Sequence, residues 1–162
     1  MKLSKKVTLV GPFGVGKTSI FRRFIDDTFS EDYKSTLGVQ IQKKVISLDH
    51  VELTLILWDT EGHMDLSEGR SAYLKGSHSF IYVFDLTRID TYENINEQIE
   101  YLTNNFPDVP VKVIGNKLDS VFKTKVNDSL KKYNVKYDYL TSAKTGEHIE
   151  TLFNEIAIEL TQ

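Results

Sequence analysis

The sequence predicts an α/β fold in which a six-stranded, mainly parallel sheet carries helices on both faces. Two observations support this prediction. Short apolar runs alternate along the chain with segments in which apolar residues recur at helical spacing. Only the runs Val39–Leu48 and Val51–Trp58 lie close enough to form an antiparallel hairpin, because just Asp49 and His50 separate them. Binding loops are therefore expected at the carboxyl ends of the parallel strands.

Six apolar runs are the predicted strands of this sheet. They are Val7–Val10, Val39–Leu48, Leu53–Trp58, Phe80–Phe84, Val111–Ile114 and Tyr137–Leu140. No internal repeat, linker or low-complexity tract interrupts the chain. A chain of 162 residues is long enough to bury roughly 70% of its unfolded surface as one domain. We therefore expect residues 1–162 to form a single domain.

Three segments between these runs have helical patterns. In the first, Ile20, Phe21 and Phe24 recur at helical spacing. The second is expected to begin at Asp90, because Glu93 three residues later completes a capping box. Its apolar stripe, which ends before Pro107, consists of Tyr92, Ile95, Ile99, Leu102 and Phe106. The apolar stripe of the last helix consists of Ile149, Leu152, Phe153, Ile156 and Leu160.

Charge and cysteine content exclude several classes of protein. The chain has 20 Lys+Arg and 23 Asp+Glu, a net charge of −3, and no basic stripe, which disfavours a nucleic-acid partner. It has no cysteine, which excludes disulfides, thiolate metal sites, a catalytic cysteine and prenyl or palmitoyl anchors. Lys2 stands where N-myristoylation needs glycine. With no signal peptide and no apolar run long enough to span a bilayer, we expect a cytoplasmic monomer without a lipid anchor.

Residues Gly11–Thr18 match the phosphate-binding pattern G-x-x-x-x-G-K-[ST] between a predicted strand and a predicted helix. Glycines let the backbone curve so that successive N–H groups point at phosphate oxygens. Lys17 brings a cation to the β- and γ-phosphates, and the Thr18 hydroxyl can ligate Mg²⁺. The helix that follows adds the positive end of its dipole. We therefore predict a protein that binds a nucleotide together with Mg²⁺.

The segment Asn116–Asp119, directly after the fifth predicted strand, indicates that the base is guanine. The Asp119 carboxylate can accept hydrogen bonds from guanine N1–H and the exocyclic amine, a pair of donors that adenine lacks. Asn116 can meet the opposite edge of the base, and the stem of Lys117 can lie along it. In the loop Thr141–Lys144, a backbone N–H can reach guanine O6. Such sites discriminate strongly because the wrong base leaves buried polar groups unpaired.

With these motifs in this order, the chain resembles a small GTPase of the Ras superfamily and is most similar to the Rab branch. The resemblance covers nearly the whole chain. The motifs that carry it are Gly11–Thr18, Tyr33–Gly38, Trp58–His63, Tyr73–Gly76, Phe84–Thr87, Asn116–Asp119 and Ser142–Lys144. It implies a P-loop small GTPase fold and a GTP-hydrolysing molecular switch. The segments around 30–38 and 60–73 would then be ordered by the γ-phosphate and Mg²⁺.

The resemblance also implies roles for individual residues. Thr36 would ligate Mg²⁺ along with Thr18, and Asp59 would hold the ion through water. The Gly62 N–H would contact the γ-phosphate, and Phe29 would pack edge-on to the base. The implied nucleotide contacts are Gly14, Val15, Gly16, Lys17, Thr18, Ser19, Phe29, Tyr33, Thr36, Gly62, Asn116, Lys117, Asp119, Ser142, Ala143 and Lys144. The implied catalytic residues are Lys17, Thr36, Gly62 and His63.

Those residues also have simpler interpretations. Without the motif spacing, Thr36 is a loop hydroxyl, Asp59 a strand-end cap and Phe29 a core residue.

Three residues around the expected γ-phosphate depart from the family pattern. Phe13 replaces a small or polar residue, and its ring would fill the path of an activating protein's arginine. His63 replaces the glutamine that orients the attacking water, and Glu61 replaces a small residue beside the Mg²⁺ site. An imidazole lacks the simultaneous donor and acceptor of an amide. We therefore expect slow intrinsic hydrolysis, unless the three changes are drift at tolerant loop positions.

The expected partner surface has changed as well. Trp58 and Tyr73 match two aromatics of the surface triad of Rabs, but Ile41 stands where the third is usually phenylalanine. Met64–Leu66 replaces the usual acidic-basic-aromatic run. The resemblance implies effector, exchange-factor and GTPase-activating proteins that bind through the switch regions, without identifying them.

Two functions stay open on this evidence: a GTPase switch, and a GTP-bound binding module with little or no hydrolysis. A P-loop nucleoside kinase is disfavoured, because guanine motifs are present and an arginine-rich lid is not. A Rab would continue into a tail that ends in cysteines, whereas Leu160–Gln162 is a plausible natural end. Membrane association is therefore expected only through partners or a missing tail.

Overall fold

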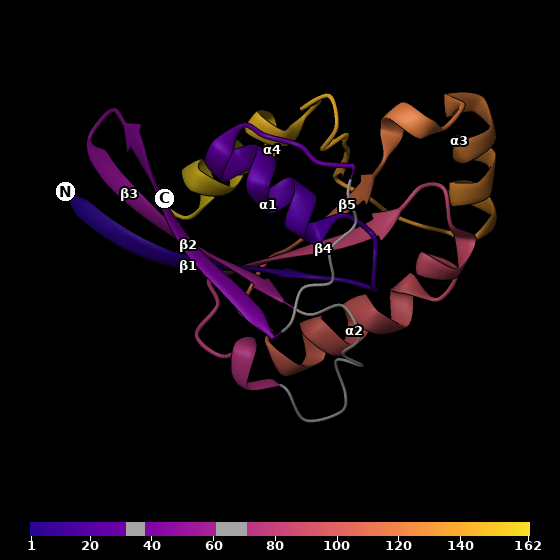
Figure 1. The fold of residues 1–162 in the computed structure, drawn as a ribbon. Coiled ribbons are helices and arrows are strands. Elements are labelled where there is room, and N and C mark those ends of the chain that lie inside the picture. The colour runs from indigo at the N-terminus through magenta and orange to yellow at the C-terminus, as the bar shows by residue number, and fades with distance from the viewer. Residues whose placement is uncertain (32–37, 61–70) are drawn as a thin grey trace.

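A computed structural model of the chain describes residues 1–31, 38–60 and 71–162. Within these residues the strands form one six-stranded sheet in the order β2-β3-β1-β4-β5-β6 (Figure 1). The strands are β1 Lys2–Val10, β2 Val39–Leu48, β3 Val51–Thr60, β4 Ser79–Asp85, β5 Val111–Asn116 and β6 Tyr139–Leu140. β2 and β3 pair antiparallel, and the other neighbouring strands pair parallel. The predicted fold class is confirmed.

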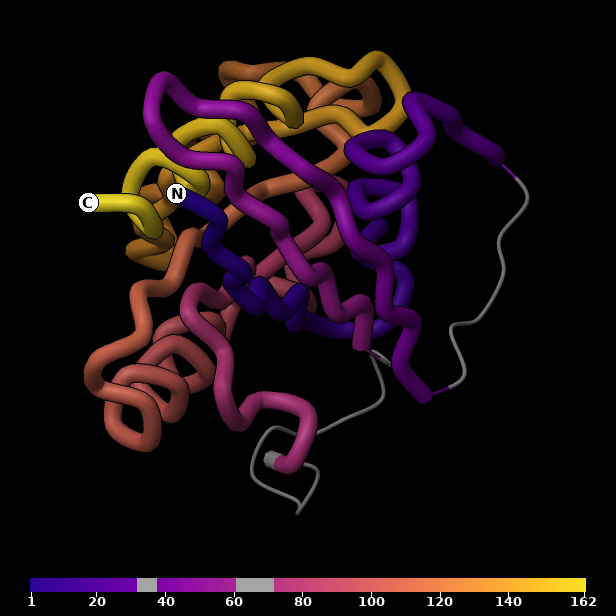
Figure 2. Tube along the Cα trace, turned by 90° about the vertical axis from the view of Figure 1, so that its left-hand side faces the viewer, coloured from indigo at the N-terminus to yellow at the C-terminus, as the bar shows by residue number. Residues whose placement is uncertain are grey.

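Helices cover both faces of this sheet. They are α1 Lys17–Asp26, α2 Ile95–Asn105, α3 Lys123–Lys132 and α4 Ile149–Glu159, with 3₁₀ turns η1 Ser71–Tyr73, η2 Ile89–Thr91 and η3 Leu118–Ser120. Figure 1 shows α1 and α4 on one side of the sheet and α2 on the other. Figure 2 shows α1 beside the long β2–β3 hairpin. Phe24 of α1 stacks on Phe153 of α4 with ring centroids 3.8 Å apart, which joins the two helices.

β4 is buried along its whole length because it lies between two apolar cores. Ile81 and Val83 belong to the core shared with α1 and α4. Phe80, Tyr82 and Phe84 belong to the core shared with α2 and α3. This alternation follows from the two-residue period of a strand, and it places the end of β4 firmly beside the end of β1.

The predicted start of the second helix is wrong. Ile89–Thr91 is the separate 3₁₀ turn η2, and α2 begins at Ile95 after Asn94, with no side-chain capping bond. The reason is a local bond that the capping-box pattern does not take into account. The Thr91 hydroxyl accepts from the Asp85 N–H at 2.9 Å, and Thr91 also bonds to the Arg88 carbonyl at 2.7 Å, so the chain turns tightly against the end of β4.

Helix α3 is absent from the sequence-based prediction. Its sequence is mostly polar, and only Val126 and Leu130, one helical turn apart, are buried. The strand boundaries differ as well: β1 begins at Lys2 because its polar first half pairs with β3, and Tyr137 lies outside β6. Among the described residues, no helix is long and apolar enough to cross a membrane.

Candidate functional site

A cavity of about 310 Å³ opens where the loops after β1, β5 and β6 meet the segment after α1. Its position at the carboxyl ends of parallel strands agrees with the expectation for this fold. Its lining consists of Phe13, Gly14, Gly16, Lys17, Thr18, Ser19, Arg22, Thr28, Phe29, Ser30, Glu31, Thr60, Asn116, Lys117, Asp119, Ser120, Ala143 and Lys144. Most of the described residues predicted to contact a nucleotide are in this set.

The loop between β1 and α1 curves tightly at two glycines. Gly11 has φ +143°, and a Cβ there would lie 2.2 Å from the Val83 carbonyl oxygen of β4. Gly16 has φ +101°, and its Cβ would lie 2.3 Å from the Asn116 side-chain nitrogen. No other residue fits either position without displacing a neighbour. These glycines therefore let the loop pass close to β4 and to the end of β5.

Lys17 is the cation of this loop. Its side chain is buried, and its Nζ donates to the carbonyls of Gly11 at 2.7 Å and Pro12 at 2.9 Å. Burial lowers the pKa of Lys17 to about 8, and the neighbouring carboxylate of Asp59 partly opposes that shift. An ammonium has three donors, so the third is available to an anion in the cavity.

The Thr18 hydroxyl and the Asp59 carboxylate place two possible oxygen ligands for a metal ion next to Lys17. The Thr18 hydroxyl donates to Asp59 Oδ2 at 2.6 Å, although the two residues are 41 positions apart in the chain. Asp59 is fully buried near the end of β3. Hydroxyl and carboxylate oxygens are ligands that suit Mg²⁺. The parts of the chain that the structure describes contain no group of three or more His, Asp or Glu that could hold a metal ion by itself.

Asn116 connects three loops of the cavity. Its Nδ2 donates to the Val15 carbonyl at 3.1 Å, and its Oδ1 accepts from Thr141 Oγ1 and from the Ala143 N–H, both at 3.2 Å. An amide carries two N–H donors, so one remains for the edge of a base. Asn116 therefore holds the loops together as well as facing the cavity.

Asp119 is oriented by two serines. Its Oδ1 accepts from Ser142 Oγ at 2.6 Å and its Oδ2 from Ser120 Oγ at 2.9 Å. Burial acts to raise the pKa of Asp119, but these hydrogen bonds outweigh burial and hold the pKa below its ordinary value. The group is therefore a carboxylate at neutral pH, as an acceptor for two donors of guanine must be.

Arg23 on α1 is a positioning residue that sequence reasoning missed. Its Nε donates to the Ala143 carbonyl at 2.8 Å and its Nη2 to the Lys144 carbonyl at 2.6 Å, while Nη1 pairs with Asp27 at 3.0 Å. These bonds attach the loop after β6 to helix α1, which follows the phosphate-binding motif Gly11–Thr18 (the phosphate loop). In the sequence Arg23 looks like any polar residue of an amphipathic helix, so no local signal identifies it.

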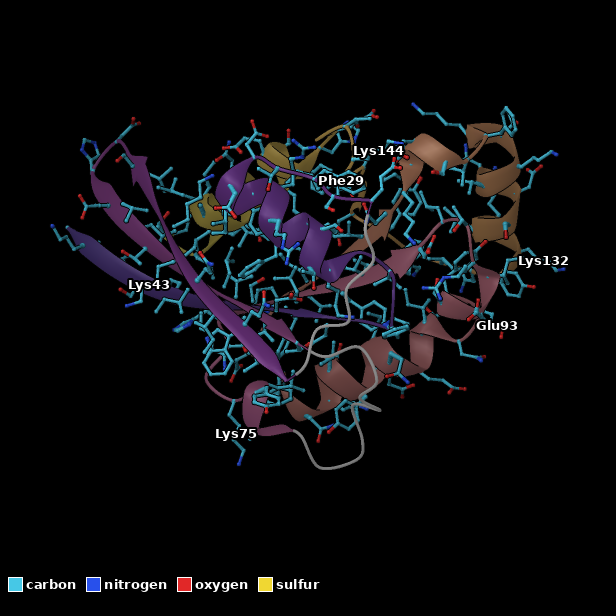
Figure 3. All side chains as sticks on the ribbon, viewed as in Figure 1. Phe29, Lys43, Lys75, Glu93, Lys132 and Lys144 are labelled. Carbon is cyan, nitrogen blue, oxygen red and sulfur yellow. The ribbon has the colours of Figure 1, made fainter. Side chains whose placement is uncertain are left out.

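Phe29 and Lys144 approach the cavity from segments far apart in the chain (Figure 3). Phe29 is partly buried against the core that contains α1 and α4, and it also lines the cavity. Lys144 Nζ pairs with Glu31 at 2.6 Å, which joins the loop after β6 to the segment after α1. Both interpretations of Phe29, as core residue and as ligand contact, are therefore compatible with its position.

Several predicted residues lie outside the described part of the chain: Tyr33, Thr36, Glu61, Gly62, His63 and Met64–Leu66. The Mg²⁺, γ-phosphate and water-orienting roles assigned to them stay predictions. The remaining predicted contacts, Val15 and Ser142, belong to the loops after β1 and β6, next to residues that line the cavity.

The three residues of the expected partner surface lie together. Ile41 of β2 is 48% exposed and is the register partner of Trp58 in β3. The rings of Trp58 and Tyr73 are 6.4 Å apart between centroids. Lys6 Nζ lies 3.8 Å from the centre of the Trp58 ring and donates to the Tyr73 carbonyl at 2.7 Å, which fixes Trp58 to the turn at Tyr73.

The chain matches the model of a known protein family over most of its length. The family model described as the Ras family matches residues 6–162. The match begins within β1 and includes every later helix and strand of the described residues, together with the loops that line the cavity.

Proposed function

The chain belongs to the Ras family, and from that membership we propose that it is a single-domain molecular switch that binds GDP and GTP and hydrolyses GTP slowly. The observation that carries this proposal is the composition of the cavity. Lys17 and Thr18 of the phosphate loop line the same cavity as Asp119 and Lys144 from the loops after β5 and β6. A cation, a hydroxyl and a carboxylate are thus available to a guanine nucleotide in one place.

Guanine would be read by Asp119 and by the loop after β6. The two serine hydroxyls hold the Asp119 carboxylate, and Asn116 holds the Ala143 N–H. The phosphates would lie against Lys17 and the backbone N–H groups of Gly14–Thr18.

Mg²⁺ suits the hydroxyl and carboxylate oxygens beside Lys17 as ligands. Thr18 and Asp59 would hold it, together with Thr36 by resemblance to the family, and the ion would neutralise charge on the phosphate oxygens. The hydrogen bond between Thr18 and Asp59 already brings both side chains to one point.

The alternative is a GTP-bound module with little or no hydrolysis. Phe13 favours it, because this residue lines the cavity at a phosphate-loop position where the family has a small or polar residue. His63, in place of the usual glutamine, favours it as well. The retained Lys17, Thr18 and Asp59 favour the switch.

The Rab branch is the proposed relationship within the superfamily. The adjacent Trp58 and Tyr73, with Ile41 in register beside Trp58, support a surface for effector and regulatory proteins. We place the protein in the cytoplasm as a monomer, with membrane contact only through partners or a tail.

The nucleotide that copurifies with the protein tests the proposal. It should be GDP or GTP. Single-turnover loss of GTP, followed with and without Mg²⁺, then separates the two functions. Slow conversion to GDP that requires Mg²⁺ supports the switch, whereas persistence of GTP with Mg²⁺ supports the binding module. A protein that holds no guanine nucleotide contradicts both.

A further inference from the structure

A cluster of charged side chains lies directly behind the phosphate loop. Asp85, at the end of β4, is fully buried and accepts from two cations through its Oδ2. Arg88 Nε is 3.0 Å away and Lys117 Nζ is 2.7 Å away. Hydrogen bonds from Lys117 and Thr87 hold the pKa of Asp85 below its ordinary value, although burial acts to raise it. The cluster is therefore a buried carboxylate shared by an arginine and a lysine.

Each of these cations also bonds to a carbonyl of the phosphate loop. Arg88 Nη2 donates to the Phe13 carbonyl at 2.7 Å, and Lys117 Nζ donates to the Gly14 carbonyl at 2.9 Å. In a planar trans peptide, the carbonyl of one residue and the N–H of the next point in opposite directions. A carbonyl that is held toward the cluster therefore turns the following N–H away from it. Arg88 thus orients the Gly14 N–H, and Lys117 orients the Val15 N–H.

The backbone around Arg88 is itself fixed. The Arg88 N–H donates to the Asp85 carbonyl at 3.1 Å, and the Thr91 hydroxyl donates to the Arg88 carbonyl at 2.7 Å. The turn that carries Arg88 is therefore anchored to the end of β4, a strand that is buried along its whole length. The Arg88 side chain is 37% exposed, so it links this anchor to the loop without being part of the core.

We propose that Arg88 is a positioning residue of the phosphate site, which uses its two-point contact with Asp85 and Phe13 to aim the Gly14 N–H of the phosphate loop at a bound nucleotide. The inference rests on the proposed binding of a guanine nucleotide. It adds to that binding site a residue that lies in none of the loop motifs. An arginine suits this role because Nε and Nη2 reach two different acceptors from one planar group. A lysine at 88 has one nitrogen on a flexible chain and cannot reproduce that fork.

Release of a fluorescent GDP analogue from Arg88→Ala, Arg88→Lys and the wild type tests the inference, with Lys136→Ala as control. Lys136 is an exposed lysine of the segment before β6, so its loss removes one positive charge elsewhere. We expect release from Arg88→Ala to be about tenfold faster than from the wild type, on the scale of one lost charge-assisted hydrogen bond. Arg88→Lys should fall between the two, and Lys136→Ala should match the wild type.

Two further readouts separate positioning from general loosening. The ³¹P resonances of bound GDP should shift in Arg88→Ala, because the donors that face the phosphates have turned. The preference for GDP over IDP should stay unchanged, because Arg88 makes no contact with Asp119, Ser142 or Ala143 among its bonds. A changed base preference with unmoved phosphate resonances would contradict the inference.

The remaining outcomes are also decisive. Release from Arg88→Lys at the wild-type rate would mean that charge alone matters, and release from Arg88→Ala at the wild-type rate would mean that Arg88 has no role; either overturns the inference. If Arg88→Ala does not fold, Arg88→Lys alone decides between the fork and the charge. If the wild type itself binds no GDP, the proposed function fails; if it binds GDP while all variants behave alike, only the inference about Arg88 fails.

Discussion

Asp119 shows how a single side chain of the site is prepared for its ligand. Ser120 and Ser142 each donate a hydroxyl to it, from its own loop and from the loop after β6. These bonds hold the carboxylate in one orientation and in its charged form, since they keep its pKa below the ordinary value against the effect of burial. A preoriented acceptor loses little conformational freedom when a base binds.

Replacing Asp119 by asparagine should change the base that is preferred. Asp119→Asn places an N–H donor opposite guanine N1–H, so one hydrogen bond becomes a clash of donors. Hydrogen bonds to charged groups contribute roughly 1.5–3 kcal/mol, so affinity for GTP should fall at least about tenfold. Xanthosine nucleotides, which offer an acceptor at that edge, should gain relative to GTP. Titration with fluorescent GTP and XTP analogues measures both effects.

Asp128→Asn is the matched control for this substitution, because Asp128 is an exposed aspartate of α3 outside the cavity lining. It should bind GTP as the wild type does. Unchanged GTP binding in Asp119→Asn would remove the assignment of base recognition to Asp119.

Helix α1 and the loop after β6 are coupled by Arg23. Its side chain is mostly buried and donates to two successive carbonyls of the loop, those of Ala143 and Lys144. The same loop supplies Ser142 to Asp119 and the Ala143 N–H to Asn116. The position of the base-reading groups therefore depends on a residue of the helix that follows the phosphate loop.

Arg23→Ala should loosen the base end of the cavity. The loop then loses two hydrogen bonds from a guanidinium, each worth roughly 1.5–3 kcal/mol when fully buried and less at this part-exposed position, and the orientation of Asp119 by Ser142 becomes weaker. GDP release should be about fivefold faster, and the preference for GDP over IDP should decrease. Release rates of the two nucleotides measure this directly. Lys123→Ala, which removes an exposed positive charge at the start of α3, should leave both quantities unchanged, and equal preference in Arg23→Ala and the wild type would contradict the coupling.

A second pair of elements, β5 and α4, is joined by an ionic network. Lys112 of β5 donates to Glu155 and Glu159 of α4, both at 2.7 Å, and the Tyr139 hydroxyl donates to Glu155. Burial acts to lower the pKa of Lys112, but its bonds to the glutamates raise it to about 12. The hydrogen bond from Lys112 lowers the pKa of Glu155 below its ordinary value of 4.5. The network thus has one strong cation between two glutamates that lie one helical turn apart.

Lys112→Met should reduce the free energy of unfolding at pH 7 by about 1 kcal/mol, because it leaves Glu155 and Glu159 as like charges at helical neighbours. A carboxyl group whose pKa is lowered in the folded state stabilises it above the unfolded pKa of 4.5, and this contribution is lost as pH falls through the folded pKa. The difference between variant and wild type should therefore shrink as pH falls below 4.5. The lysine acts in the opposite window: its raised pKa stabilises the fold fully below 10.5 and loses effect as pH rises through about 12.

Urea unfolding of both proteins at pH 7 and pH 4 measures this convergence. Lys131→Met removes an exposed lysine near the end of α3 and should cost little at either pH. A difference that stays constant or grows on acidification would show that the two glutamates do not contribute through their charge.

The elements differ in how well the sequence predicted them. β4 is predictable because its buried residues form a continuous apolar run, and the β2–β3 hairpin because two residues alone separate its strands. α3 is not predictable from its pattern, because only Val126 and Leu130 of its ten residues are buried, too few for a visible period. The capping pattern gives the wrong start for α2, because Thr91 bonds to Asp85 and Arg88, contacts that follow from the end of β4.

The same distinction holds in the site. Lys17, Thr18 and Asp119 stand in motifs whose chemistry is local, and all three line the cavity. Arg23 and Arg88 act on loops 120 and 75 positions away, so neither belongs to the motif of the loop that it holds. Residues that hold a ligand are predictable from motifs, whereas residues that hold the motifs in place become visible only when the chain is folded.

Across the whole molecule, the cavity is the point at which distant segments meet. The phosphate loop, the segment after α1, and the loops after β5 and β6 all line it. Direct bonds such as Asn116 to Val15 and Lys117 to Gly14 already connect them across about a hundred positions of sequence. A nucleotide that touches each segment would add contacts that the unfolded chain cannot make.

Removing the nucleotide should therefore destabilise the entire fold, not one loop. A ligand at one hundred times its dissociation constant stabilises the native state by about 2.7 kcal/mol, which for a chain of this size raises the melting temperature by about 5–10 °C. Nucleotide-free protein melted with GDP and Mg²⁺ should show that rise.

Three controls test its origin. ADP, which carries the same phosphates on another base, should give a much smaller rise. EDTA should reduce the effect of GDP, because it would withdraw the ion from Thr18 and Asp59. Asp119→Asn provides the internal control, because its phosphate loop is intact. In this variant the rise caused by GDP should become smaller, whereas the response to ADP should not change. An equal rise with ADP would mean that the cavity does not read guanine, and no rise with either nucleotide would mean that it does not bind them.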